Sequence, residues 1–403
     1  MRKYSAILML LLCASFAIRV NAWDAPYSER RVGEKIFVSA AAADAMDDTT
    51  MKIEANCASA LLMEASTGKI LMAENEYERR FPASVTKIMS LILVCEAIEN
   101  GKLSLSEEIA ATKEACSKGG SQIWLEEGEM MTVDDLLKAT CVFSANDACT
   151  LLGEAVAGSD EAFTALMNER AAQLGMKDTH FENCTGLDDS AKEHLTTAYD
   201  IALMSRELLR HDIIKKYSTI YMDSLRGGKT QLVNTNKLVR TYKGLTGLKT
   251  GTTDKAGCCI SASAERDGLS LIAVVLGAPN SADRFSAAKN MLDWGFANYE
   301  CYIPSLGDMQ LPEVSVLRGK EKTLVPVADS FTPVVLARGQ SKDVKIQLNV
   351  SGPVHAPVEA GQILGTIRFV LNDEMLAEYE LKADRYIKQS TPMDYFARVF
   401  GLR

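Results

Sequence analysis

A change in hydrophobic pattern near Ser305 most constrains what this chain of 403 residues can fold into. Before that point, apolar runs of helical spacing are mixed with strand-like runs and turn signals. After it, short strands are separated by Gly, Pro, Asp and Asn. The two patterns predict a mixed α/β (α+β) domain over 56–303 and a small, sandwich-like all-β domain over 304–390. The strand candidates of the second domain are Leu311 to Val327, Val334 to Leu336, Val344 to Val350, Ile363 to Val370 and Ala377 to Leu381.

Turn and capping signals predict the elements of the first domain. Two hairpins are expected, one turning at Ser66-Thr67-Gly68 and one at Asp267-Gly268. Their strands are Ala60 to Met63 with Ile70 to Met72, and Cys259 to Ala264 with Leu269 to Leu276. Helices are expected from near Ser84, from Thr132 to Lys138, from Ser159 to before Gly175, from Thr197 to Leu209 and from Ala287 to Phe296.

The first 22 residues have the pattern of a signal peptide. Two basic residues precede the apolar stretch Tyr4 to Ile18, and Val20-Asn21-Ala22 supplies the small residues of a cleavage site. The alternative is an uncleaved anchor, but the apolar run is shorter than the roughly 20 residues of a spanning helix. We therefore expect an exported, extracytoplasmic protein in which the polar residues 23–55 form a loose arm.

The last segment, 391–403, is predicted to be an amphipathic helix. Thr391 and Pro392 fit the cap and the first helical position, and Met393, Phe396 and Phe400 share one face. A helix of about 13 residues reaches only about 20 Å, too short to cross a bilayer. It is either an interfacial anchor on the outer face of the cytoplasmic membrane or a tail packed on the β-domain. No basic cluster flanks it, and both alternatives stay open.

Charge, cysteines and histidines exclude several functions. A net charge of -9 disfavours a nucleic-acid binder, which usually carries a basic balance. Of the ten cysteines, Cys13 falls in the predicted leader, and the rest are odd in number and lack a Cys-x-x-Cys pair. We interpret them as buried free thiols. The four histidines lack metal-ligand spacing, so we predict no metal and no other cofactor.

Ser84 and Lys87 stand at the start of a run, Ile88 to Val94, that is apolar on nearly every side. Such a helix is normally buried, and a spacing of three places both side chains on one face. Burial disfavours the ammonium form of Lys87, so its pKa should fall and the amine can act as a base. A serine hydroxyl needs such a base to become a nucleophile. Alone, however, Ser-x-x-Lys recurs by chance in many chains.

A second polar segment, Ser144-Ala145-Asn146, comes just before a helical pattern. At such a junction short polar side chains can face a cleft. Ser144 is a candidate proton relay to a leaving amine, and Asn146 a candidate donor to a substrate amide and a brace for Lys87. Alternatively, these residues only cap the helix, because Ser and Asn are favoured at that position.

A third segment, Lys249 to Thr253, leads into the second hairpin. A cation followed by small hydroxyl residues on an edge strand suits a bound carboxylate, with Lys249 supplying charge and Thr250 or Thr253 hydroxyls. Gly251 lets a ligand backbone come close. The amide of Thr252 is a candidate partner of the Ser84 amide in an oxyanion hole. Read singly, the segment is only a polar turn.

Together the three segments form the set Ser-x-x-Lys, Ser-x-Asn and Lys-Thr-Gly, in the order found in penicillin-binding proteins and class A β-lactamases. From Ala58 onwards, the chain resembles the low-molecular-weight penicillin-binding proteins, serine-type D-Ala-D-Ala carboxypeptidases of peptidase family S11. The segments that carry the resemblance are Thr67 to Leu71, Pro82 to Lys87, Gly120-Ser121 with Trp124-Leu125, Ser144 to Ala148, Gly186 to Asp188, Thr197 to Asp200 and Lys249 to Gly251.

The resemblance implies a β-lactamase/transpeptidase-like fold, with an antiparallel sheet, helices on both faces and a helical subdomain. It also implies that Lys87 deprotonates Ser84, which attacks the penultimate D-Ala carbonyl of a peptidoglycan stem peptide. Terminal D-Ala then leaves with Ser144 and Lys87 as a proton route, and water hydrolyses the acyl-enzyme. Lys249 and Thr250 would hold the terminal carboxylate, and β-lactams would acylate Ser84 and leave slowly.

Two alternatives remain. A class A β-lactamase would carry a Glu-x-x-Leu-Asn segment for the deacylating water, and none occurs between Asn146 and Lys249. The additional β-domain also argues against it. A non-catalytic wall-binding or β-lactam-sensing protein with the same fold is disfavoured by the intact Ser84, Lys87 and Ser144.

Overall fold

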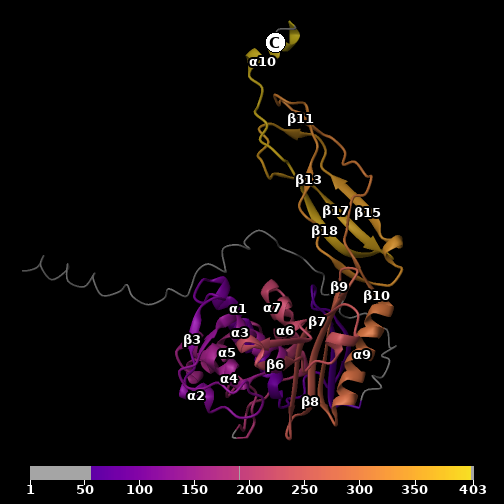
Figure 1. Ribbon diagram of the computed structural model, residues 1–403. Helices are drawn as coiled ribbons and strands as arrows, with labels where there is room; N and C mark the ends of the chain where they lie inside the picture. The colour runs from indigo at the N-terminus through magenta and orange to yellow at the C-terminus, as the bar shows by residue number, and fades with distance from the viewer. Residues whose placement is uncertain (1–55, 190, 401–403) are drawn as a thin grey trace, which may run out of the picture.

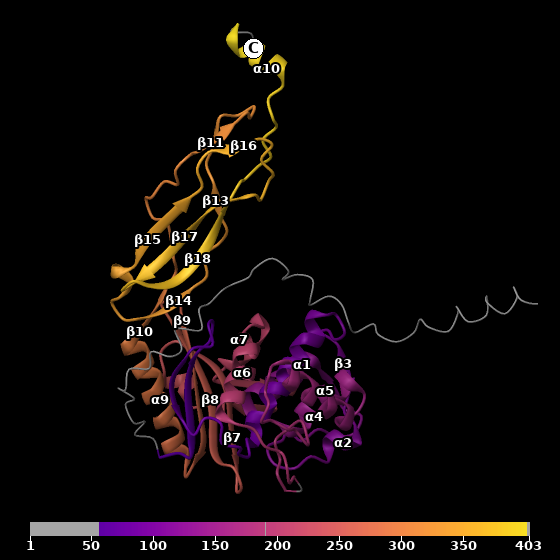
Figure 2. The same ribbon diagram turned by 180° about the vertical axis from the view of Figure 1, so that it is seen from behind.

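The computed structural model describes residues 56–189 and 191–400 (Figure 1). The predicted leader over 1–22, the arm over 23–55 and the last three residues of the segment 391–403 lie outside the described residues. In the described part, a layered domain of helices and a sheet is followed by a β-rich domain that extends away from it (Figures 1 and 2).

A five-stranded antiparallel sheet organises the first domain. Its strand order is β2 (Ile70–Glu74), β1 (Ser59–Glu64), β9 (Leu269–Ala278), β8 (Gly257–Arg266) and β7 (Leu245–Thr253). Both predicted hairpins are confirmed. Asp267 and Gly268 have φ values of 50° and 79°, the left-handed conformation that a two-residue hairpin turn requires. Strand β7, which carries Lys249 to Thr253, is an edge strand, as expected.

Helices cover both faces of this sheet, so its strands are apolar on both sides. Along β1, Leu61 and Met63 pack into the helical core, whereas Ala60 and Leu62 pack against α9 (Ser281–Asn298) on the other face. The predicted fold class is confirmed. Helix α9 begins earlier than the predicted Ala287, because the side chain of Asn280 accepts a hydrogen bond from Asp283 N and caps it.

Three helices of the first domain begin at side-chain caps. Thr132, Ser159 and Thr197 each cap a helix with a side-chain oxygen, which confirms three predicted helix starts. The helices are α1 (Lys87–Glu99), α2 (Lys113–Cys116), α3 (Val133–Lys138), α4 (Asn146–Ala157), α5 (Asp160–Gln173), α6 (Ala198–Leu208), α7 (Asp212–Ser218) and α8 (Leu238–Thr241). Two small two-stranded antiparallel sheets lie between these helices in the chain. One pairs β3 (Glu108–Ala110) with β4 (Met130–Thr132), and the other pairs β5 (Met222–Leu225) with β6 (Thr230–Val233).

The second domain is all-β, as predicted, and its sheets are small. Strand β10 (Tyr299–Tyr302), which comes before the predicted boundary at 304, pairs with β14 (Val334–Ala337). The other two sheets have the orders β12 (Thr323–Leu324), β11 (Val314–Leu317), β16 (Val354–His355), and β13 (Val327–Ala328), β18 (Glu374–Lys382), β17 (Ile363–Leu371), β15 (Lys345–Val350). The single strand expected over Leu311 to Val327 is wrong. It is split into three because Arg318 turns the chain with a φ of 60°, and Gly319 packs too closely on Val316 to carry a side chain.

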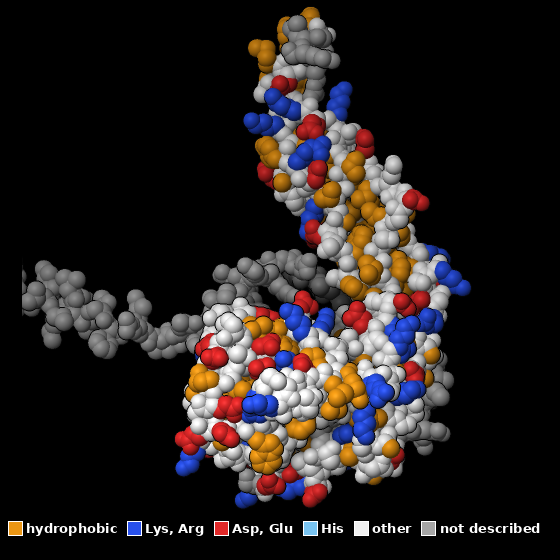
Figure 3. Space-filling view, viewed as in Figure 1, with side chains coloured by type: hydrophobic (Ala, Val, Ile, Leu, Met, Phe, Trp, Pro, Cys, Tyr) orange, Lys and Arg blue, Asp and Glu red, His pale blue; other side chains and the backbone are white. Residues whose placement is uncertain are grey.

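Helix α10 (Pro392–Val399) lies at the far end of the chain, beyond the β-domain (Figure 1). Thr391 and Asp394 form a capping box, as the Thr391-Pro392 signal suggested. Met393 and Val399 are 75% and 79% exposed, so in this structure the helix does not bury its apolar face on the β-domain (Figure 3). Among the described residues, no helix has the length and apolar character needed to span a bilayer.

Candidate active site

Ser84 lies in a short 3₁₀ turn, Ala83–Thr86, directly ahead of α1. The prediction had placed it in the first α-helical turn itself. Its side chain is only partly buried, so solvent and ligands can reach it. The turn is held by backbone packing: a Cβ on Gly186 would lie 1.8 Å from the carbonyl oxygen of Ala83, so only glycine fits there. Ala83 itself has a left-handed φ of 49°, a strained conformation of the kind that gathers at functional sites.

Lys87 is fully buried and points its amine at Ser84. Its Nζ lies 2.9 Å from Ser84 Oγ, 2.5 Å from Asn146 Oδ1 and 2.8 Å from the carbonyl oxygen of Thr185. Burial lowers the pKa of Lys87 to about 8. A neutral amine has two hydrogens and one lone pair. The two carbonyl-type acceptors take the hydrogens, which leaves the lone pair for the proton of Ser84.

The second segment is held at the start of α4, beside Lys87. Ser144 has a φ of 65° and ends a π-helical turn, Ala139–Phe143, so the chain reverses sharply there. Asn146 is the first residue of α4, and its side-chain amide donates to the carbonyl of Gly119 at 2.7 Å. No side-chain cap bond forms at this helix start. The capping alternative is therefore wrong, because the Asn146 side chain is used by Lys87 and Gly119 instead.

The side chain of Ser144 is almost fully buried but has no hydrogen-bond partner within 56–189 and 191–400. Its hydroxyl is thus available to a ligand. Asp147 holds the neighbouring segment that contains Ile123 and Leu125, because its carboxylate accepts hydrogen bonds from the amides of both residues. Asp147 was not singled out as a site residue from the sequence, and it positions the loop that carries Gly119 and Gly120.

The third segment lies against Ser84. A Cβ on Gly251 would lie 2.8 Å from the backbone nitrogen of Ser84, so glycine is what allows β7 to pass so close. Lys249 is buried, and its Nζ donates to the carbonyl of Thr250 at 2.8 Å. Burial, and then the nearby charge of Lys87, hold the pKa of Lys249 well below its usual range. The structure therefore brings the three segments together: Asn146 contacts Lys87, and Gly251 packs against Ser84.

The hydroxyls of this strand have different partners. Thr250 Oγ1 donates to Thr235 at 2.7 Å, and Thr253 Oγ1 donates to Asp188 at 2.5 Å. The hydroxyl of Thr252 donates to the carbonyl of Gly251 at 2.8 Å. The Thr253 hydroxyl is therefore occupied by Asp188. The Thr250 hydroxyl is bonded to the Thr235 hydroxyl, and both hydroxyls can bind an oxygen of a ligand.

Two contacts around Lys87 have no sequence signature. The carbonyl of Thr185 is a backbone group, and Thr86 Oγ1 lies 2.8 Å from His194 Nε2. Because His194 Nδ1 accepts the amide hydrogen of Glu182, its Nε2 carries the proton and donates to Thr86. Burial lowers the pKa of His194 to about 4, which keeps it neutral at physiological pH. The Gly186 segment carried only a family likeness in the sequence, without a role.

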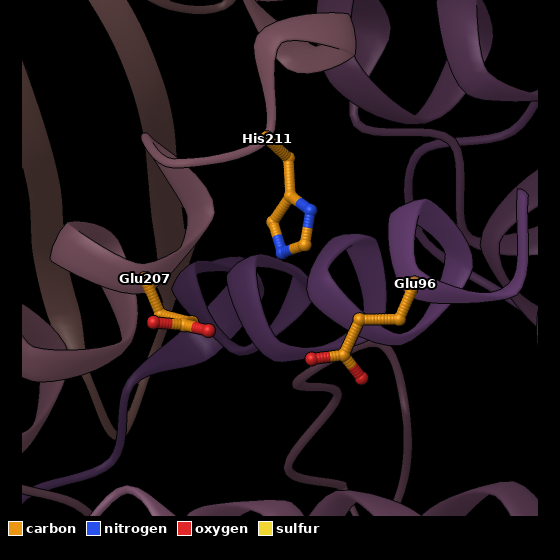
Figure 4. Close-up of side chains that lie close together, drawn as sticks. All are labelled: Glu96, Glu207 and His211. Carbon is orange, nitrogen blue, oxygen red and sulfur yellow. The ribbon is translucent and has the colours of Figure 1, made fainter. Parts of the chain in front are cut away.

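A separate cluster brings together Glu96, Glu207 and His211, whose potential metal-ligand atoms lie within 4.8 Å of one another (Figure 4). Arg170 Nη2 donates to both carboxylates, at 2.7 Å each. A cation would have to displace this guanidinium, so we interpret the cluster as an ion-pair network. The nine described cysteines are all unpaired, and six of them are buried, as free structural thiols would be.

Comparisons with known proteins agree with this geometry. The family model described as D-alanyl-D-alanine carboxypeptidase, peptidase S11, matches residues 44–280, and a model of the penicillin-binding protein 5 C-terminal domain matches 308–389. One relative is the D-alanyl-D-alanine carboxypeptidase DacF of Bacillus subtilis. It is 37% identical over 376 residues, which cover 92% of this chain and 96% of that protein.

Solved structures share the fold. Penicillin-binding protein 5 of Haemophilus influenzae superposes with a TM-score of 0.70 at 27% identity, over 83% of this chain and 98% of that one. Penicillin-binding protein D2 of Listeria monocytogenes, solved in its ampicillin-bound form, superposes with a TM-score of 0.56 at 31% identity, over 61% and 100%. The chain belongs to the D-alanyl-D-alanine carboxypeptidases of peptidase family S11, which are serine peptidases.

Proposed function

We propose that this chain removes the terminal D-Ala from peptidoglycan stem peptides ending in D-Ala-D-Ala, through an acyl-enzyme on Ser84. The observation that carries the proposal is the Lys87 amine, buried and 2.9 Å from Ser84 Oγ, with two carbonyl-type acceptors for its hydrogens. This arrangement suits a neutral lysine acting as the general base for a serine nucleophile.

The reaction runs in two halves. Lys87 takes the Ser84 proton while Ser84 Oγ attacks the carbonyl of the penultimate D-Ala. The tetrahedral intermediate collapses and expels D-Ala, whose nitrogen receives a proton from Lys87 by way of Ser144. A water molecule, deprotonated by the same amine, then hydrolyses the ester and frees Ser84.

We assign substrate binding to the third segment. Lys249 and Thr250 bind the terminal carboxylate of the peptide, and Gly251 lets the peptide backbone lie along β7 as an added strand. The backbone amides of Ser84 and Thr252 form the oxyanion hole. Thr253 closes this end of the site through its bond to Asp188. Asn146 orients the substrate amide in addition to bracing Lys87.

β-Lactams are proposed as inhibitors that acylate Ser84, since the similar Listeria protein was solved with ampicillin bound. A class A-like β-lactamase remains the alternative function. Its distinguishing residue, a glutamate in Glu-x-x-Leu-Asn, does not occur between Asn146 and Lys249. We therefore expect the ester formed with a β-lactam to persist rather than turn over.

The test is release of D-Ala from a soluble pentapeptide by the full chain and by Ser84→Ala. We expect release by the wild-type protein only, together with a stoichiometric and long-lived penicillin adduct. Normal release by folded Ser84→Ala would overturn the assignment of the nucleophile. Rapid penicillin hydrolysis without D-Ala release would favour the β-lactamase.

We also propose where the protein works. Residues 1–22 direct export, and the enzyme acts on the wall at the outer face of the cytoplasmic membrane. The exposed apolar face of α10 supports peripheral contact with that membrane, because such a helix lies in the interface with its apolar side down. The domains proposed are 56–303 for catalysis and 304–390 as a spacer that carries α10.

A further inference from the structure

Arg284 projects from the first turns of α9 to the end of strand β7, and its guanidinium is almost fully buried. Its Nη1 donates to the carbonyl oxygen of Gly251 at 3.0 Å, to Thr252 Oγ1 at 3.0 Å and to the carbonyl oxygen of Cys259 at 3.2 Å. The cation thus bridges β7 and β8 at the point where β7 passes Ser84. None of the three sequence segments includes it.

The surroundings of Arg284 destabilise its positive charge. Its Nη2 donates to Ser281 Oγ at 3.2 Å, and its guanidinium lies 4.7 Å from the ring centroid of Phe285. Among the described residues, no carboxylate is paired with it, and its Nε has no hydrogen-bond partner. Burial lowers its pKa. It also lies near the N-terminus of α9, where the helix dipole disfavours positive charge. A buried cation without a carboxylate partner destabilises a fold even when neutral groups accept its hydrogen bonds, so its presence calls for a functional reason.

The carbonyl oxygen of Gly251, which accepts a hydrogen bond from Arg284, suggests what the functional reason is. The carbonyl of Gly251 and the amide of Thr252 belong to one peptide unit, which is trans. In a planar trans peptide the N–H points away from the C=O. With the C=O directed at Arg284, the N–H of Thr252 is directed to the opposite, unpaired edge of β7. A cation bound to a peptide oxygen polarises that unit and makes its N–H a stronger donor, as in other hydrogen-bond chains.

We propose that Arg284 is a positioning residue that orients and polarises the Gly251–Thr252 peptide, so that the Thr252 amide binds the oxyanion strongly. This inference rests on the proposed function, because it takes Ser84 as the nucleophile and Thr252 N–H as an oxyanion-hole donor. It predicts that Arg284 acts on the acylation step rather than on the initial binding of the ligand.

The test compares Arg284→Met and Arg284→Lys with the wild-type full chain. Penicillin acylation followed by stopped flow separates the dissociation constant of the first complex from the acylation rate constant. We expect Arg284→Met to acylate about 10- to 100-fold more slowly, a smaller loss than the 10²–10³-fold reported for deleting a whole donor. Its dissociation constant should change less than about threefold. Arg284→Lys, which keeps a cation, should recover part of the rate.

Infrared spectra of the acyl-enzyme formed with a ¹³C-carbonyl β-lactam supply a readout that a purely structural role would not move. A weaker donor polarises the ester carbonyl less, so its band should shift to higher wavenumber in Arg284→Met and to an intermediate position in Arg284→Lys. An unchanged rate constant and an unchanged band in either folded variant would overturn the proposal, even if stability fell.

Two controls keep the outcomes separate. The wild-type chain must first form its adduct on Ser84; failure there overturns the proposed function and not the role of Arg284 alone. If Arg284→Met does not fold, Arg284→Lys carries the test. Its shorter ammonium reaches Gly251 O less well, so its band must still move to higher wavenumber, and a band at the wild-type position would contradict the inference.

Discussion

The site around Ser84 and the tip formed by α10 differ in which side chains they bury. Around Ser84, polar groups are buried, and most of them have partners: the Lys87 amine has three, and the side-chain amide of Asn146 both accepts and donates a hydrogen bond. At the tip, apolar groups are exposed: the rings of Phe396 and Phe400 stack at 4.4 Å between centroids yet remain more than half exposed.

Each arrangement destabilises the fold when it is considered alone. We expect the first to serve the chemistry and the second to serve contact with a membrane. Burying an amine destabilises its charged form, which suits Lys87 to the proposed role of base. Exposing aromatic rings to water loses hydrophobic stabilisation that a lipid surface restores. The two regions should therefore fail independently. Variants around Ser84 should change the rate of acylation, whereas variants in α10 should change only how strongly the protein binds a membrane.

Lys87→Ala should have the largest effect. Without the base, acylation by fluorescent penicillin should slow by about 10³-fold or more, because general-base catalysis alone contributes 10²–10⁴-fold. The measurement is the labelling rate of protein shown by circular dichroism to be folded. Normal labelling of the folded variant would remove Lys87 as the base.

The acid limb of the wild-type pH profile should follow the same amine. Because the pKa of Lys87 is lowered to about 8, acylation should rise with pH through that value as the amine loses its proton. Asn146→Asp places a carboxylate beside Nζ, which stabilises the ammonium form and raises its pKa. We expect the limb to move up by about one to two pH units, and the rate at pH 7 to fall about 10- to 100-fold.

Asn146→Ala is the matched control for that shift. It removes an acceptor without adding charge, so it should lower the plateau of the profile without moving the limb to higher pH. If the limb of Asn146→Asp stays at the wild-type position, a group other than Lys87 controls the profile.

The smallest effect on catalysis should come from the tip. The double variant Phe396→Ser, Phe400→Ser should bind vesicles of phosphatidylethanolamine and phosphatidylglycerol about tenfold less in a sedimentation assay, because two exposed rings no longer enter the interface. D-Ala release from a soluble pentapeptide should not change. Tyr386→Ser, at a similarly exposed ring in the β-domain, is the control and should bind as the wild type does. Equal binding by all three proteins would exclude α10 as the anchor.

The same contrast shows what a sequence can predict. The apolar run after Lys87 required a buried helix, and its spacing placed Ser84 within reach of the amine; the structure has both. The carbonyl of Thr185 could not be predicted, because every residue has one and only the folded chain brings this one to Nζ. Arg284 lay outside the known motifs. The apolar pattern predicts a start of α9 at Ala287, whereas the polar Asn280 cap, which lies outside that pattern, starts the helix at Ser281.

The β-domain was harder to predict in detail. Its strands are short, and its cores are small, so a local turn decides where each strand ends. The positive φ of Arg318 broke the strand expected over Leu311 to Val327, and nothing in the residue type signals that conformation. The all-β class of this domain followed from the pattern, whereas the register of its sheets did not.

The central claim is that Ser84, activated by a neutral Lys87, forms the covalent intermediate. Mass spectrometry of the full chain after penicillin treatment, followed by peptide mapping, tests it most directly. We predict one adduct per chain, on the peptide that contains Ser84, forming faster as pH rises through about 8. An adduct on another residue, or folded protein that stays unmodified at saturating penicillin, would contradict the account.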